Sequence, residues 1–256
     1  MESYRYMFQG AYFEGNFPDF PCPRCRAGVI KARQDTLQKF QSGYSIIESV
    51  EDWWDASDEV SKFNLMMICD RQDCGEVVAV LGDVTWSKNP AEVADDGTPI
   101  GDGEWEWFLV PKCFNPPLSI VRVPEDTPGS VFSSIRRASW NFWADRRSSA
   151  NHLRAALECL LDHLNVARKA SKANRGYLSL NARIELLVGI DPAHKKIFNA
   201  LRKIGNLGSH GDEVGRNDLL DCFQLIEYVL DAYFGNRKEK AAAIADSLLS
   251  GETQLR

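Results

Sequence analysis

Four cysteines in the first third of the chain form two close pairs. Cys22 and Cys25 are separated by Pro-Arg, and Cys69 and Cys74 are separated by Asp-Arg-Gln-Asp. Two tight turns that each offer two thiolates suit the closed, tetrahedral sites in which proteins hold structural Zn²⁺. The spacing therefore predicts one structural zinc ion bound by these four cysteines. A site of this kind leaves no coordination position for water or substrate.

The interval between the two pairs is longer than in a compact zinc ribbon. It spans 43 residues, against about 15 to 20 in the usual spacing. We therefore expect a zinc-ribbon-like domain with a long insertion. Cys113 is either a core residue or an alternative ligand, and ordinary buried or reactive thiols are the alternative to zinc for all four. Because the seven cysteines are an odd number, a disulfide framework is less favoured than metal ligation.

A second group of reactive side chains lies near residue 206. Arg202, Asn206 and His210 recur every four residues and would form a polar stripe on a continuous helix. The glycines interleaved with them predict that the helix loosens or ends there. An imidazole can move a proton near neutral pH, and an arginine can neutralise charge that develops on a phosphate.

The elements expected around these residues divide the chain in two. Alternating, aromatic-rich stretches predict strands at residues 62–69, 76–81 and 105–110. Beyond a proline-rich stretch the apolar spacing becomes helical, and helices are expected from Thr127, at about 149–170 and 180–188, after Pro192, around 219–234 and at 241–249. We therefore expect an α+β fold: a small β-rich zinc-binding domain over residues 1–120, and an all-α bundle over residues 121–256.

Charge is distributed unevenly between the two parts. Residues 1–125 carry 11 basic and 21 acidic side chains, whereas residues 126–210 carry 14 and 6. The basic excess permits a polyanion as partner, although basic side chains that only solvate helices would give the same count. The many tryptophans are expected mostly in a core, with some available to stack on bases or on a partner.

Several classes of protein are disfavoured by what the sequence lacks. There is no apolar run of 18 residues and no apolar leader at the N-terminus, so we expect a cytoplasmic protein without membrane contact. A phosphate-binding loop, a dinucleotide-binding turn, a hydrolase nucleophile elbow and a zincin helix are also absent from the sequence.

The segment from Arg202 to His210, together with Arg154-Ala-Ala-Leu-Glu158, resembles the prokaryotic domain-of-unknown-function family 4145 (DUF4145). The resemblance implies a HEPN-like helical domain behind a cysteine-rich head. Many HEPN proteins are dimeric ribonucleases of toxin and phage-defence systems that need no metal. It thus implies a homodimer, with RNA and a partner protein of a defence system as partners.

The resemblance also assigns roles to residues of this chain. His210 and Asn206 match the histidine and the polar residue of the catalytic motif, but Gly205 stands where an arginine is usual. Arg202 could replace that arginine only if the glycines fold the chain back, or if it comes from a second subunit. Lys203 and Arg154 are the expected substrate-binding residues.

Two functions therefore stay open at this point. One is RNA binding with metal-independent cleavage, in which the motif around His210 is degenerate but active. The other is a non-catalytic dimeric interaction module that binds nucleic acid or protein. Plainer roles are also open, with His210 as a capping or interface residue and Arg154 in an ordinary ion pair with Glu158 on one helix.

Overall fold

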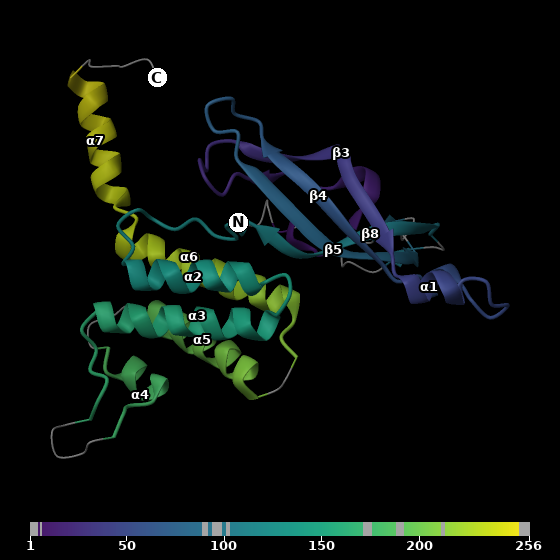
Figure 1. Cartoon of the computed structure of the whole chain (residues 1–256). Coiled ribbons are helices and arrows are strands. Elements are labelled where there is room, and N and C mark those ends of the chain that lie inside the picture. The colour runs from purple at the N-terminus through teal and green to yellow at the C-terminus, as the bar shows by residue number, and fades with distance from the viewer. Residues whose placement is uncertain are drawn as a thin grey trace. The chain divides into compact units, whose positions relative to one another are not determined.

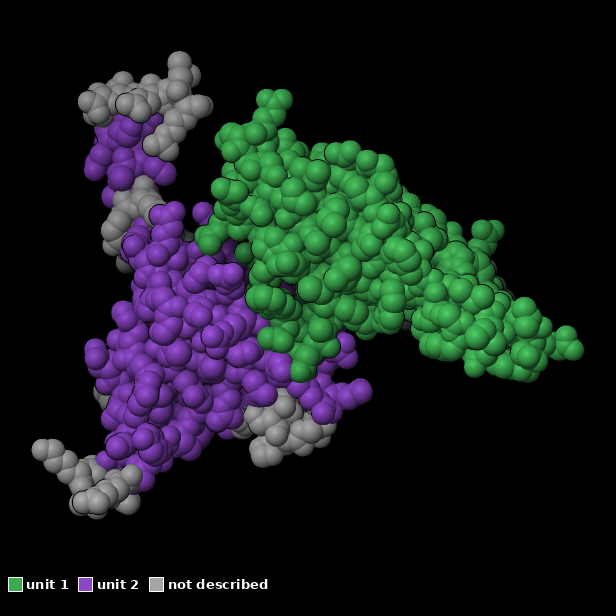
Figure 2. All heavy atoms as spheres, in the orientation of Figure 1, with its two compact units in different colours: residues 1–119, 139–145 green, residues 120–138, 146–256 purple. Residues whose placement is uncertain are grey.

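The protein consists of two compact units, seen in a computed structural model (Figure 2). Unit 1 comprises Met1–Ser119 and Ser139–Asp145, and unit 2 comprises Ile120–Ala138 and Arg146–Arg256. The structure describes residues 5, 7–88, 92–93, 99–100, 103–170, 176–187, 192–210 and 213–250; the side chains of 92–93, 99–100, 192, 206–210, 237–240 and 250 are not described. The fold is α+β, with the sheet in the N-terminal half and most helices in the C-terminal half (Figure 1).

Unit 1 is built on a six-stranded antiparallel sheet with the strand order β1-β8-β5-β4-β3-β2. Its strands are β1 (Tyr12–Phe13), β2 (Phe20–Pro21), β3 (Val29–Gln41), β4 (Ser61–Cys69), β5 (Val77–Lys88) and β8 (Trp105–Asn115). A ribbon of β6 (Glu92–Val93) and β7 (Pro99–Ile100) lies between β5 and β8 in sequence. The three predicted strands are confirmed as β4, β5 and β8, and the last two extend beyond the predicted ends.

The insertion between the cysteine pairs is a strand, a short helix and a second strand. β3 leads away from the first pair, and α1 (Gly43–Glu48) and the 3-10 turn η3 (Ala56–Asp58) connect it to β4, which returns to the second pair. The sequence pattern does not predict β3, because most of its side chains are polar or exposed and show no clear alternation. β4, in contrast, alternates strictly between buried and more exposed positions.

The core of unit 1 lies on one face of the sheet. β4 and β5 contribute fully buried side chains to it, including Leu65, Met67 and Val80. Aromatic residues from the N-terminal segment, from β8 and from residues 139–145 form a continuous cluster: Phe8, Tyr12, Phe17, Phe20, Phe114, Phe142 and Trp143. A segment between two helices thus belongs to the core of the β-rich unit.

Unit 2 is a set of helices around a leucine-rich core. Its helices are α2 (Gly129–Asn141), whose last residues belong to unit 1, α3 (Arg146–His163), α4 (Leu180–Glu185), α5 (Pro192–His210), α6 (Arg216–Phe234) and α7 (Arg237–Ser250). α3 packs against α5 and α6. The core includes Leu157, Phe198 and Phe223. Within the described part of the chain, no helix has the length and apolar character that a membrane span requires.

The end of α3 differs from the prediction. The apolar spacing predicts a helix to about residue 170, but α3 ends at His163. Asn165 adopts a left-handed conformation (φ 58°), and the Val166 amide donates to the Leu161 carbonyl at 2.9 Å. These two features are typical of a helix C-terminus, in which asparagine can replace the usual glycine.

Candidate metal centre and the α5 motif

The two cysteine pairs converge in unit 1. The Sγ atoms of Cys22, Cys25, Cys69 and Cys74 all lie within 4.8 Å of one another. The Cys22 and Cys74 sulfurs are 3.7 Å apart, and those of Cys25 and Cys69 are 3.8 Å apart. In a tetrahedral site with Zn–S bonds of about 2.3 Å, neighbouring sulfurs lie about 3.8 Å apart. The donor set and its dimensions therefore fit one zinc ion.

The sheet explains why pairs so distant in sequence meet. The first pair lies in the connection from β2 to β3. In the second pair Cys69 is the last residue of β4, and Cys74 lies in the connection from β4 to β5. β3 and β4 are antiparallel neighbours, with Ile30 opposite Cys69, so both connections lie at the same end of the sheet. The Asp70 amide donates to the Val29 carbonyl at 2.9 Å, and the Val29 amide donates to the Asp70 carboxylate at 3.0 Å. These bonds hold the two turns side by side.

Gly28 of the first turn lies close against the second turn. Its carbonyl accepts from the Cys22 amide at 2.9 Å, and its amide donates to the Cys25 sulfur at 3.3 Å. A Cβ atom at this position would lie 2.8 Å from the Cys69 sulfur and 2.8 Å from a carboxylate oxygen of Asp70. The first turn therefore needs a residue without a side chain next to the second pair.

The thiols of the cluster differ in acidity. Backbone amides of Ala27 and Gly28 lower the pKa of Cys25 to about 6. The Arg71 amide acts to lower the pKa of Cys69, but burial and the other three sulfurs outweigh it and raise that pKa to about 12. The thiolate is the form that binds metal. Because neighbouring thiolates repel one another, a central cation would favour the ionisation of all four.

The remaining cysteines do not join the cluster. Cys113 lies on β8 opposite Leu81 and is partly buried. Cys159 is partly buried on α3, and Cys222 is buried on α6. Among the residues that the structure describes, the two pairs form the single group of three or more candidate ligands.

The expected break in the glycine-rich segment is wrong, because α5 continues without interruption to His210. Gly205 is buried and lies against Arg154 of α3. A Cβ atom at position 205 would lie 2.6 Å from the Arg154 Cβ and 3.2 Å from its Cγ and Cδ. Gly205 thus lets two helices approach closely, and this packing leaves no room for an arginine there.

The other motif residues follow the course of α5. Arg202 donates from Nε to the Asn199 side-chain oxygen at 3.3 Å, and Lys203 is exposed. Since a helix rises about 1.5 Å per residue, the backbones of Arg202 and His210 are separated by about 12 Å. The fold-back that would bring them together within one chain does not occur. The side chains of Asn206 and His210 lie outside the described part of the structure.

Arg154 forms the expected ion pair within its own helix. Its Nε lies 3.2 Å from a carboxylate oxygen of Glu158, four residues further along α3. The expected i,i+4 ion pair between these two residues is therefore confirmed. Arg154 also has its aliphatic stem on Gly205, so the same side chain connects α3 to the α5 motif.

Two groups of side chains have no signal in the sequence. Asp162 and the buried Arg183 lie 2.7 Å apart, although 21 residues separate them in the chain. The prediction that the tryptophans lie mostly in a core is also wrong, because Trp143 alone among the seven is buried. Three of the others, Trp86, Trp105 and Trp107, gather on one face of β5 and β8.

Comparisons with known proteins give two matches, both to families of unknown function. Residues 10–114, which include all four cysteines of the cluster, match a domain of unknown function, DUF8608. Neither the curated proteins nor the solved structures contain a significant match. Residues 136–247, which include α3, α5 and α6, match a domain of unknown function, DUF4145, and this match supports the family resemblance of the helical part.

Proposed function

We propose that the protein is a zinc-stabilised RNA-binding module. One structural zinc ion holds the turns of unit 1, and unit 2 is a HEPN-like domain that dimerises and binds RNA without cleaving it, in a defence-type system. The observation that carries the zinc assignment is the set of four sulfurs within 4.8 Å of one another. The observation that favours binding over cleavage is the packing of Arg154 on Gly205.

The zinc ion has a structural role in this proposal. All four ligands are protein thiolates, so neither water nor substrate has a coordination position. The ion would fix the ends of β3 and β4 by joining the two turns. It would also balance the charge of four closely spaced thiolates.

Metal analysis of the purified chain tests this role. We expect one zinc per chain, and we expect Cys69→Ser to lose it and to destabilise unit 1. Cys113→Ser is the matched control, because Cys113 lies on the same sheet outside the cluster. Absence of zinc from the unmodified chain, or equal zinc in the Cys69→Ser variant, would remove the metal from the proposal.

RNA binding is supported by the charge of the helical unit. Residues 126–210 carry 14 basic against 6 acidic side chains. Arg136 of α2, Arg147 of α3 and Lys196 and Lys203 of α5 are among the exposed ones. Basic side chains that contact phosphates release counterions, so binding through them weakens steeply as salt increases.

Cleavage lacks the arginine that the motif normally provides. In such chemistry a guanidinium neutralises charge on the phosphate while the histidine moves a proton. Gly205 cannot provide it, and Arg202 points toward Asn199. One observation supports cleavage as a second candidate. The Cβ, Cγ and Cδ atoms of Arg154 lie within 3.2 Å of the position that a Cβ atom of residue 205 would occupy. Arg154 could then supply the guanidinium from α3.

A single set of assays separates the two candidates. A labelled single-stranded RNA is incubated with the full chain, with His210→Ala, with Arg154→Ala and Arg154→Lys, and with Lys196→Ala/Lys203→Ala. Both binding and cleavage are followed across salt concentrations. We expect binding without cleavage, and we expect the lysine pair variant to reduce the salt slope by about 2. Lys62→Ala/Lys112→Ala in unit 1 is the matched control.

The results have distinct meanings. Cleavage that His210→Ala and Arg154→Ala both abolish, while Arg154→Lys partly retains it, would establish the second candidate in place of the first. Binding that shows no salt dependence, or that the two lysine pairs weaken equally, would contradict RNA recognition by unit 2.

A further inference from the structure

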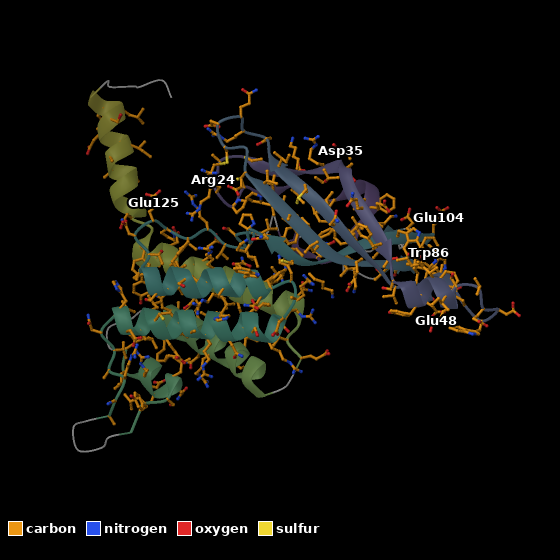
Figure 3. The ribbon with its side chains drawn as sticks, viewed as in Figure 1. Arg24, Asp35, Glu48, Trp86, Glu104 and Glu125 are labelled. Atoms are coloured by element: carbon orange, nitrogen blue, oxygen red, sulfur yellow. The ribbon has the colours of Figure 1, made fainter. Side chains whose placement is uncertain are left out.

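An open aromatic hollow lies in unit 1, away from the cysteine cluster. It has a volume of about 380 Å³ and is lined by Phe13, Glu14, Gly15, Trp86, Trp105, Glu106 and Trp107. This volume lies in the range of small-ligand sites, about 300 to 1,000 Å³. Trp86 and Trp105 belong to the ends of β5 and β8 opposite the cysteine turns. In Figure 3 Trp86 accordingly lies toward one end of the sheet and Arg24, beside Cys25, toward the other.

The tryptophans of the hollow lie on the same face of the sheet as the core of unit 1, past the last buried residues of β5 and β8. Trp86 and Trp107 share a strand face with the buried Val84 and Leu109, to which they are next but one in sequence. The Trp86 and Trp105 rings are nearly parallel, with centroids 6.3 Å apart, and the Trp86 and Trp107 centroids are 4.9 Å apart. Trp105 is 48% exposed. Three large indole surfaces are therefore held together where solvent can reach them.

The charge around the hollow indicates what would bind. Glu14 and Glu106 are among the lining residues, and no basic residue is. Glu48 and Glu104 are exposed toward the same end of the sheet (Figure 3). The only ion pair described for Glu14 is with Lys39, at 2.7 Å. Indole faces attract cations, and acidic surroundings oppose the phosphates of a nucleic acid that would stack its bases there.

We propose that this hollow binds a quaternary ammonium group. Indole faces attract an alkylated cation and pack against its methyl groups, and the carboxylates of Glu14 and Glu106 add an attraction for its positive charge. A trimethylated ammonium has no N–H donor and keeps its positive charge. The site lies in unit 1, at the end of the sheet opposite the cysteine turns, and shares no residue with the proposed zinc centre. Its natural ligand is a choline-like small molecule or a trimethyllysine side chain.

Nuclear magnetic resonance of the seven indole N–H groups in the full chain tests the proposal. Choline is titrated, and 3,3-dimethyl-1-butanol, its uncharged isostere, is titrated in parallel. We expect choline to shift the indole signals of Trp86, Trp105 and Trp107, identified from single Trp→Phe variants, and to leave that of the exposed Trp53 unchanged. The isostere should bind at least about tenfold more weakly, because it lacks the cation–π attraction.

Two variants, each with a matched control, locate the binding and test the contribution of charge. Trp105→Ala should weaken choline binding about tenfold, whereas Trp53→Ala should leave it unchanged. Glu14→Gln should weaken binding several-fold, and Asp83→Asn is its matched control, because Asp83 pairs with Lys62 on the same sheet but does not line the hollow. Zinc content is measured on each variant as a check that unit 1 remains folded.

The ligand source follows from a third titration, with a short peptide that carries trimethyllysine. Tighter binding of the peptide than of choline assigns the site to a modified protein, and the reverse assigns it to a small molecule. No saturable shift with either cation up to about 10 mM would overturn the proposal. Equal binding of choline and its isostere, or displacement of choline by single-stranded RNA, would also overturn it.

Discussion

At the scale of single residues, Gly28 shows that a turn can be specified by a partner distant in sequence. The glycine follows the first cysteine pair closely, which is a local signal for a turn. Its structural reason is different, because its φ is not among the positive ones and the space for a side chain is occupied by Cys69, Asp70 and Arg71. The sequence therefore predicts a turn at Gly28, but it does not predict that the second cysteine turn excludes a side chain there.

Gly28→Ala should lower zinc affinity without removing a ligand. The added Cβ would displace the Cys69 sulfur or the Asp70 carboxylate, which accepts from the Val29 amide. Loss of such a supporting contact typically weakens metal binding about 10- to 100-fold. Competition with a chromophoric chelator measures this. Gly43→Ala is the control, since nothing lies within 4 Å of a Cβ there; equal affinities of the two variants would contradict the prediction.

Asp162 is the residue on which an ionic contribution to the stability of unit 2 depends. Hydrogen bonds from Arg168 and then Arg183 lower its pKa. Arg183 is buried, so Asp162→Asn would leave a guanidinium with too little compensation and should cost about 2 kcal/mol of unfolding free energy. The exposed pair of Asp35 with Arg33 provides the control, because Asp35→Asn should leave stability unchanged within error.

The pH dependence of the Asp162 contribution has a definite sign. A carboxyl whose pKa is lowered by folding stabilises the fold above the pKa it has when unfolded, about 3.9. The contribution is lost as pH falls below about 4, toward the lower pKa of the folded state. The difference in stability between the wild type and Asp162→Asn, measured by urea unfolding, should therefore be large at pH 6 and shrink at pH 3. A difference that does not change with pH would exclude this mechanism.

At the scale of elements, sequence periodicity predicts best those segments with one buried face. β4 alternates strictly and is predicted nearly to the residue, whereas β3 carries mostly polar side chains and is not predicted. The start of α2 is indicated by Thr127 and Pro128 within two residues. The end of α3 is not, because an asparagine instead of a glycine takes the left-handed position.

α5 shows that interior glycines can serve packing instead of ending a helix. Local propensity penalises each of them by about 1 kcal/mol relative to alanine, and on that ground alone it predicts a break in the helix. The contact between Gly205 and Arg154 outweighs that preference by letting α3 and α5 approach closely. The four-residue spacing of Arg202, Asn206 and His210 therefore places them along one helix, as the pattern predicts when helix continues.

Gly205→Ala should destabilise unit 2 although alanine is the better helix former. The new Cβ would lie 2.6 Å from the Cβ of Arg154, so the helices must separate. Overpacking of this kind costs about 1 to 3 kcal/mol, more than the propensity gained. Gly129→Ala in α2 has open space and should be neutral or stabilising. Thermal unfolding of both variants decides, and a stabilised Gly205→Ala variant would contradict the close contact.

At the scale of the whole molecule, the boundary between the units does not follow chain order. A change of composition near residue 120 can be seen in the sequence, and unit 1 ends its first segment at Ser119. Residues 139–145 also belong to unit 1, because Phe142 and Trp143 pack in its aromatic cluster. Nothing in the helical periodicity indicates this, since Phe142 continues the apolar stripe of α2.

Zinc removal should therefore destabilise both sequence segments of unit 1, residues 1–119 and 139–145, and leave the helices of unit 2 folded. If zinc holds the turns of unit 1, a chelator should raise amide hydrogen exchange in β3, β4 and β5, and also in residues 139–145, which share their core. Exchange in α3, α5 and α6 should stay low, because unit 2 has its own buried core. Mass spectrometry of peptides from the full chain measures this.

The control is Cys69→Ser without chelator, which should give the same pattern. Increased exchange in all helices would mean that the units unfold together, and protection of residues 139–145 after metal loss would contradict their place in unit 1.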